Sequence, residues 1–75
     1  MQYTQHAGGS QPGKAISHSG TCDLCGAQDC PDIFDAQLLI GGRRQWCWSC
    51  QTCFDTRIGR LGVGAGQHYT RSATK

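Results

Sequence analysis

The chain has 75 residues, six of them cysteine, and a formal net charge of +2. This length allows one small domain at most, and so small a hydrophobic core usually needs a metal or disulfides for stability. No stretch is long enough to span a membrane and no export signal is visible, which argues against a membrane protein and a secreted disulfide scaffold. Metal-bound cysteines in a reducing cytosol are expected instead.

The N-terminal segment, residues 1–20, is polar and contains repeated Gly and Pro residues. It has too few large apolar residues to offset the entropy of ordering, so it predicts a disordered arm. The folded domain is expected over residues 21–59. It begins with the knuckle Cys22-Asp-Leu-Cys25-Gly26, in which Gly26 can take a positive φ that turns backbone N–H groups toward the sulfurs.

A β-hairpin and a short helix are expected after this knuckle. Residues 33–40 predict a strand, Gly41-Gly42 a tight turn, and residues 43–46 a return strand. After the second knuckle, residues 50–58 lack Gly and Pro and predict a short helix with Gly59 as its C-cap. Three residues would share one face of this helix: Cys50, Phe54 and Ile58.

The C-terminal segment, residues 60–75, is rich in Gly and carries Arg and Lys without any acidic residue. Glycine disfavours a helix there, so a loose or extended basic tail is expected, which Tyr69 could anchor. The chain is therefore predicted to be a small metal-stabilised domain between disordered termini.

Two Cys-x-x-Cys units separated by 21 residues indicate one tetrahedral zinc site. With all four positions filled by cysteine, no position is left for a water molecule, so the site would be structural and the protein would not be an enzyme. The expected ligands of one Zn²⁺ are Cys22, Cys25, Cys47 and Cys50. The order knuckle, hairpin, knuckle, helix favours a treble clef, with a zinc ribbon as the alternative.

Cys30 and Cys53 stand outside this pattern. The plain interpretation is two half-buried free thiols. The alternatives are a Cys30–Cys53 disulfide, a second metal, and an iron–sulfur cluster, which needs only four cysteines. Cys53 follows Cys50 by three residues, so on a helix it would lie near the same face and could replace a ligand.

A partner-binding surface is predicted between the second knuckle and the basic tail. Trp46 and Trp48 are expected on one strand face, either as a cover for the metal core or as an exposed aromatic pair. Four thiolates and one Zn²⁺ contribute −2 against the formal +2, which argues against strong duplex binding and favours a protein partner. A nucleic-acid module is the alternative, and a metal store is a third. The candidate contacts are Trp48, Arg57, Arg60 and Tyr69.

The order of these motifs resembles a family of small zinc-binding proteins encoded by tailed bacteriophages. The resemblance covers about residues 22–69 and ends in a Gly-rich Gly-Gln-x-Tyr segment. It departs from the family at Gln51, where a His is common, and in an insertion near residues 55–60. The resemblance implies a phage protein that acts in the cytoplasm of an infected bacterium. The matching pieces are Cys22–Gly26, Ile33–Ala36, Gly42 with Trp46, Cys47–Cys50 and Leu61–Tyr69.

Overall fold

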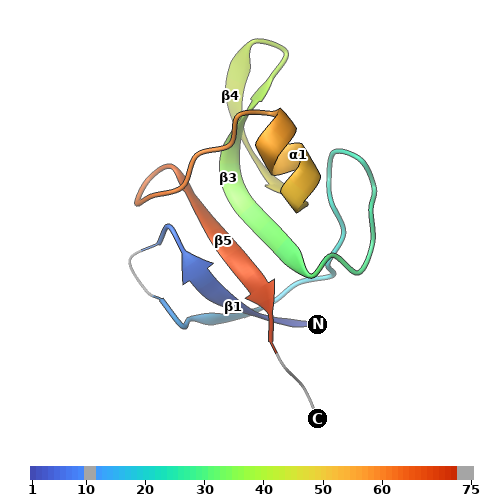
Figure 1. Ribbon diagram of the computed structural model, residues 1–75, viewed down its shortest axis with the longest axis vertical. Coiled ribbons are helices and arrows are strands. Elements are labelled where there is room, and N and C mark those ends of the chain that lie inside the picture. The colour runs from blue at the N-terminus through green and yellow to red at the C-terminus, as the bar shows by residue number, and fades with distance from the viewer. Residues whose placement is uncertain (10–11, 73–75) are drawn as a thin grey trace.

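The computed structural model describes residues 1–9 and 12–72, which form one antiparallel sheet and a short helix (Figure 1). The five strands lie in the order β2-β1-β5-β3-β4, so the chain's last strand lies at the centre of the sheet. Every neighbouring pair of strands is antiparallel. The elements are β1 (Gln2–Ala7), β2 (Ala15–Ser17), β3 (Asp32–Ile40), β4 (Arg43–Ser49), α1 (Gln51–Thr56) and β5 (Gly66–Arg71).

The predicted hairpin is confirmed as β3 and β4. Gly41 and Gly42 both have positive φ angles, 59° and 80°, which is the backbone of a two-residue turn whose twist matches the flanking strands. The return strand is longer than predicted, because it continues past Trp46 to Ser49. This extension makes Cys47 a strand residue directly opposite Ala36 on β3.

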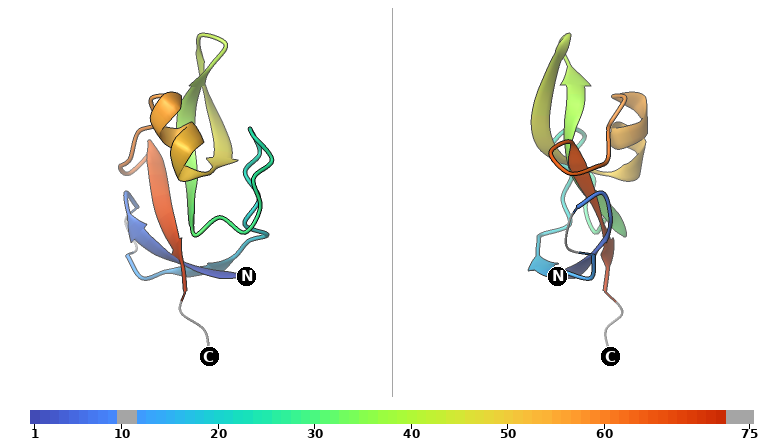
Figure 2. Two further views of the ribbon diagram at one scale, coloured as in Figure 1. Left: turned by 45° about the vertical axis from the view of Figure 1, so that its right-hand side comes forward. Right: turned by 90° about the vertical axis from the view of Figure 1, so that its left-hand side faces the viewer.

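The predicted helix is confirmed over a shorter range, α1, and lies against one face of the hairpin (Figure 2). The ring of Phe54 stacks on that of Phe34, with the ring centroids 4.0 Å apart. The predicted apolar face is wrong at Ile58, which is 59% exposed. Ile58 takes the left-handed conformation, with a φ of 52°, while the N–H of Gly59 donates to Phe54 O.

The disordered arm predicted over residues 1–20 is wrong for the described residues, which form β1 and β2; residues 10–11 lie outside the described part. Tyr3 is fully buried, and its hydroxyl donates to the carbonyl of Cys30 at 2.6 Å. Sequence composition missed this strand because its partner is distant: β1 pairs with β5, some 60 residues further along the chain.

The loose or extended tail predicted over residues 60–75 is extended at residues 66–71 but not loose, and residues 73–75 lie outside the described part. Residues 66–71 form β5, which is hydrogen-bonded to β1 on one side and to β3 on the other. Tyr69 pairs with both Gln5 and Ile33 and is only 5% exposed. The tail is therefore the central strand of the sheet.

The core has two parts, one on each face of the sheet, because neighbouring strand residues point to opposite faces. One part lies between β1, β3, β5 and the segment that carries Cys22 and Cys30. Its buried members are Tyr3, Cys22, Cys30, Ile33 and Tyr69. The other lies under α1, and its buried members are Phe34, Ala36, Leu38 and Phe54. Three of the cysteines pack within or against the first part: Cys22, Cys50 and Cys53.

Gly66 lies close to neighbouring backbone on two sides, which gives a direct test of the central strand. A Cβ at residue 66 would lie 2.3 Å from the carbonyl oxygen of Arg60 and 2.5 Å from Ala36 Cβ. We expect Gly66→Ala to lower the free energy of unfolding by about 1–3 kcal/mol, because backbone on both sides must shift. Urea unfolding of the metal-loaded protein measures this, with Thr70→Ala on the same strand as control. An unchanged urea midpoint for Gly66→Ala would show that β5 does not pack against Arg60 and Ala36 at this position.

Candidate metal centre

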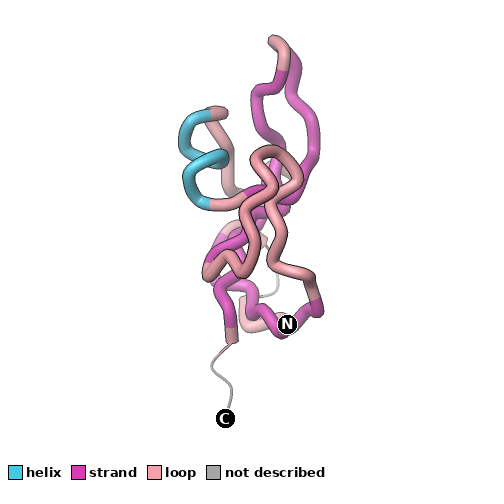
Figure 3. Tube along the Cα trace, turned by 90° about the vertical axis from the view of Figure 1, so that its right-hand side faces the viewer, coloured by secondary structure: helices cyan, strands magenta, loops and turns pink. Residues whose placement is uncertain are grey.

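Four cysteines lie together where the segment before β3 meets the start of α1. The backbone of both segments can be followed in Figure 3. Their Sγ atoms all lie within 4.8 Å of one another, and the Sγ atoms of Cys25 and Cys50 are 3.8 Å apart. Tetrahedral zinc–sulfur bonds of about 2.3 Å place neighbouring sulfurs about 3.8 Å apart. These four cysteines are therefore positioned to hold a metal ion: Cys22, Cys25, Cys50 and Cys53.

The first pair lies on a tight turn of the predicted knuckle type. The backbone N–H groups of Leu24 and Cys25 point at the Sγ of Cys22, at 3.4 and 3.5 Å. Gly26 has a φ of 79°, and its N–H donates to the carbonyl of Cys22, which closes the turn. Burial raises the pKa of the Cys22 thiol, but these and other hydrogen bonds outweigh it and lower the pKa to about 6. Cys22 is thus prepared to act as a thiolate ligand.

The second pair belongs to the first turn of α1. Cys50 is the N-cap residue, with extended backbone angles of φ −80° and ψ 173°, and Cys53 is the third residue of the helix. Residues three apart lie on the same side of a helix, so both sulfurs can face one ion. The helix geometry thus selects Cys50-Gln-Thr-Cys53 as the second Cys-x-x-Cys unit.

The predicted ligand Cys47 is not in this group, and Cys53 stands in its place. The physical reason is the length of β4: Cys47 lies inside a strand and packs against the core under α1 instead of facing the other sulfurs. Burial raises the pKa of the Cys47 thiol, and the charge of Asp23 raises it further. The sequence did contain the signal, since Cys47, Cys50 and Cys53 form two overlapping Cys-x-x-Cys units.

The four grouped thiols cannot all lose their protons without a cation. Burial raises the pKa of Cys53, and hydrogen bonds from its thiol to the sulfurs of the other three cysteines raise it further. A bound divalent cation reverses this preference, because its charge stabilises every thiolate around it. The arrangement therefore favours binding of a metal ion over a cluster of free thiols at neutral pH.

Cys30 is close to the group but does not belong to it. It is buried, its Sγ lies 3.7 Å from the carbonyl oxygen of Ala27, and burial raises the pKa of its thiol. All six cysteines are free thiols, so the alternative of a Cys30–Cys53 disulfide is not found. A cleft of about 300 Å³ lies between the segment 27–32 and the start of α1, and Cys50 contributes to its lining.

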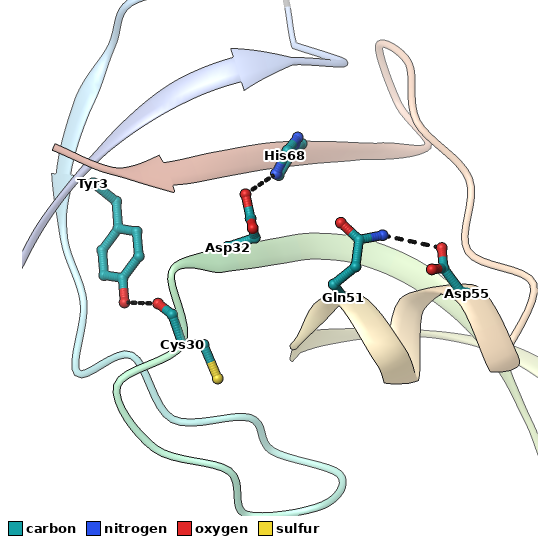
Figure 4. A network of polar contacts seen from close by, with 6 residues as sticks. All are labelled: Tyr3, Cys30, Asp32, Gln51, Asp55 and His68. Carbon is teal, nitrogen blue, oxygen red and sulfur yellow. Dashed lines mark hydrogen bonds and ion pairs between the residues drawn. The ribbon is translucent and has the colours of Figure 1, made fainter.

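Polar contacts hold the two segments that flank the cluster (Figure 4). Tyr3 fixes the carbonyl of Cys30, and Nε2 of His68 lies 2.8 Å from a carboxylate oxygen of Asp32 at the start of β3. On α1, the side-chain amide of Gln51 donates to Asp55 at 3.0 Å. The position of the cysteines thus depends on contacts from β1 and β5, which are remote in sequence.

The four predicted partner contacts do not form one surface. Tyr69 belongs to the core, and Trp48 is half-buried between Tyr69 and His18, with ring centroids 5.8 and 4.4 Å away. Trp48 therefore covers the core, whereas its neighbour on the same face, Trp46, is 50% exposed. Arg57 and Arg60 are exposed, as a partner contact requires.

Comparison of the chain with protein-family models, with curated proteins and with solved structures gave no significant match. Within the described residues, the only helix is α1, and it is far too short to cross a bilayer.

Proposed function

We propose that the four grouped cysteines hold one structural Zn²⁺ in a treble-clef arrangement. The support is the order of the elements: a cysteine knuckle, the hairpin β3–β4, and a helix whose first turn supplies the second pair. Sulfur is a preferred zinc ligand, and the distance of 3.8 Å between Cys25 and Cys50 sulfurs suits a tetrahedron. Because four protein ligands complete the coordination, the ion would stabilise the fold and would not activate water.

The role we propose for this domain is to bind and modulate a host or phage protein machine in the cytoplasm of an infected bacterium. The main support for a protein partner is the exposure of apolar side chains in the loop between α1 and β5. Its three large apolar side chains are exposed: Ile58 by 59%, Leu61 by 42% and Val63 by 79%. Arg57, which precedes Ile58, and Arg60, between Ile58 and Leu61, are exposed as well. Apolar side chains beside arginine are typical of a protein-binding patch.

The backbone of this loop gives further support. Ile58 is β-branched, and its φ of 52° is a conformation that such residues rarely adopt. A strained and solvent-exposed apolar residue has no evident role in folding, because a glycine would end the helix at lower cost. We therefore interpret Ile58 as part of the partner contact.

A nucleic-acid module remains the second candidate, but the arginines support it less well. The guanidinium groups of Arg44 and Arg71 donate to backbone carbonyls of Ile58 and Asp29, so they are partly committed to the fold. The aromatic residue that nucleic-acid stacking would need, Trp48, is half-buried. A protein partner fits the exposed apolar loop better.

The test begins with capture of partners from bacterial lysate by the zinc-loaded protein, followed by calorimetry with the purified partner. We expect Leu61→Asp combined with Val63→Asp to raise the dissociation constant about 30-fold or more, because the apolar contact is lost. The matched control places the same two charges on exposed positions elsewhere, Ser19→Asp with Gln28→Asp, and should change it less than about threefold.

Two outcomes would contradict the proposed function. The first is equal affinity of the partner for the loop variant and the control. The second is tight binding of duplex DNA with a strong salt dependence. A plot of the logarithm of the association constant against the logarithm of salt concentration would then have a slope of roughly −3 to −4, which indicates several phosphate contacts. In that case the nucleic-acid alternative would replace our proposal.

A further inference from the structure

The outer edge of β4 is open. β4 is the last strand in the sheet order and has seven residues without Pro. Of its two charged residues, Arg43 and Arg44, the second has its guanidinium turned back over β3 to the carbonyls of Gln37 and Ile58. The opposite edge strand, β2, has only three residues. Natural sheets usually protect long edges with charges, proline or a covering segment, because an open edge pairs with other strands. Figures 1 and 3 show that the tip of the β3–β4 hairpin projects past α1.

The two-residue turn decides which backbone groups of β4 face outward. It makes Ile40 and Arg43 a hydrogen-bonded pair. From Arg43 onward, every second residue of β4 therefore forms backbone hydrogen bonds with β3, and the residues between them point their N–H and C=O groups to the other side. The N–H and C=O groups of Arg44, Trp46 and Trp48 then point away from β3. The carbonyl of Trp48 confirms this alternation, since it accepts a hydrogen bond of 2.9 Å from the N–H of Asp23.

Arg44 and Trp46 therefore present two N–H donors and two C=O acceptors on the outer edge. Within the described residues, no hydrogen bond to these four outward backbone groups is found. Trp46 is also one of the large apolar side chains that remain exposed. The knuckle covers the edge only at Trp48, so the free part is the half of the strand next to the turn.

We propose that this edge pairs with the same edge of a second copy of the chain, as an antiparallel dimer about a two-fold axis. In the register we infer, Arg44 lies opposite the partner's Trp46, and Trp46 lies opposite the partner's Arg44. The axis passes between Gln45 and the partner's Gln45. All four outward groups of each copy are then used, in four hydrogen bonds across the interface.

The side chains suit this register. Each arginine of one copy meets a neutral residue of the other: Arg44 meets the partner's Trp46, and Arg43 meets the partner's Cys47. No arginines are opposed, which avoids repulsion between like charges directly across the strand pair. A register centred on Trp46 is less suitable, because it needs the carbonyl of Trp48, which already accepts from Asp23.

The experiment compares two substitutions in the full-length, zinc-loaded protein. Trp46→Ala and Trp46→Pro both remove the indole, but only proline removes the outward N–H, and this N–H makes no bond to β3. By sedimentation equilibrium, we expect Trp46→Ala to raise the dimer dissociation constant about tenfold or more. Trp46→Pro should raise it at least about tenfold further, since each dimer loses two donors.

A second measurement keeps the test valid if Trp46→Pro does not fold. In the wild-type protein, the amides of Arg44 and Trp46 should exchange with solvent more slowly as protein concentration rises, because pairing protects them. Exchange at both amides that does not depend on concentration would overturn the proposal. So would a wild-type protein that stays monomeric to about 1 mM, or a dimer that Trp46→Ala and Trp46→Pro weaken equally.

Discussion

Replacing Cys53 with alanine is expected to release the metal ion and unfold the domain, whereas the same change at Cys47 should leave both intact. Cys53 is one of the four grouped sulfurs, while Cys47 packs against the core beneath α1. In so small a domain the free energy of metal binding is largely folding free energy. We expect Cys53→Ala to cost roughly 4 kcal/mol or more and Cys47→Ala about 1 kcal/mol.

Metal content by elemental analysis and the near-ultraviolet signal of the tryptophans measure the two effects. The wild-type protein should contain one metal ion per chain, and identification of that ion as zinc tests the proposed cofactor. The signal should disappear when a chelator removes the ion, and it should likewise be absent in Cys53→Ala. Loss of metal in Cys47→Ala, with a full complement in Cys53→Ala, would restore the sequence-based ligand set and contradict the geometry reported above.

Tyr3→Ala is expected to lower the free energy of unfolding by about 3–5 kcal/mol, because it removes a fully buried ring and leaves a cavity. This loss is comparable to the whole free energy of unfolding expected for a 75-residue chain, so the variant should be largely unfolded. Tyr3→Phe is the matched control. It keeps the ring but leaves the carbonyl of Cys30 without its 2.6 Å hydrogen bond, which should cost about 1–2 kcal/mol.

Urea unfolding at fixed protein and zinc concentrations gives both values, since ligand excess shifts apparent stability. A Tyr3→Ala protein as stable as the wild type would show that β1 is not part of the folded sheet. The result would then favour the disordered N-terminal arm that composition alone predicts. Backbone order parameters of residues 2–7 would distinguish the two cases independently.

The local features of this chain were determined by its sequence. Gly41-Gly42 after the apolar run that ends at Ile40 specifies a two-residue hairpin, since glycine takes the required positive φ without steric cost. The Cys22–Cys25 knuckle followed by Gly26 specifies a turn whose N–H groups face sulfur. These features depend on neighbouring residues only, so the pattern of residue types is enough to predict them. The presence of a metal-binding cysteine group follows from the same kind of local spacing.

The tertiary structure alone decided the fourth member of the group and the role of both termini. Whether Cys47 or Cys53 joins Cys50 depends on where β4 ends, and pairing of Ser49 with Phe34 carries the strand past Cys47. Likewise, Tyr69 becomes a core residue only because β5 is hydrogen-bonded on both sides. Strands are stabilised by pairing and packing with residues remote in the chain. Segments that are polar or Gly-rich by composition can therefore still become central strands.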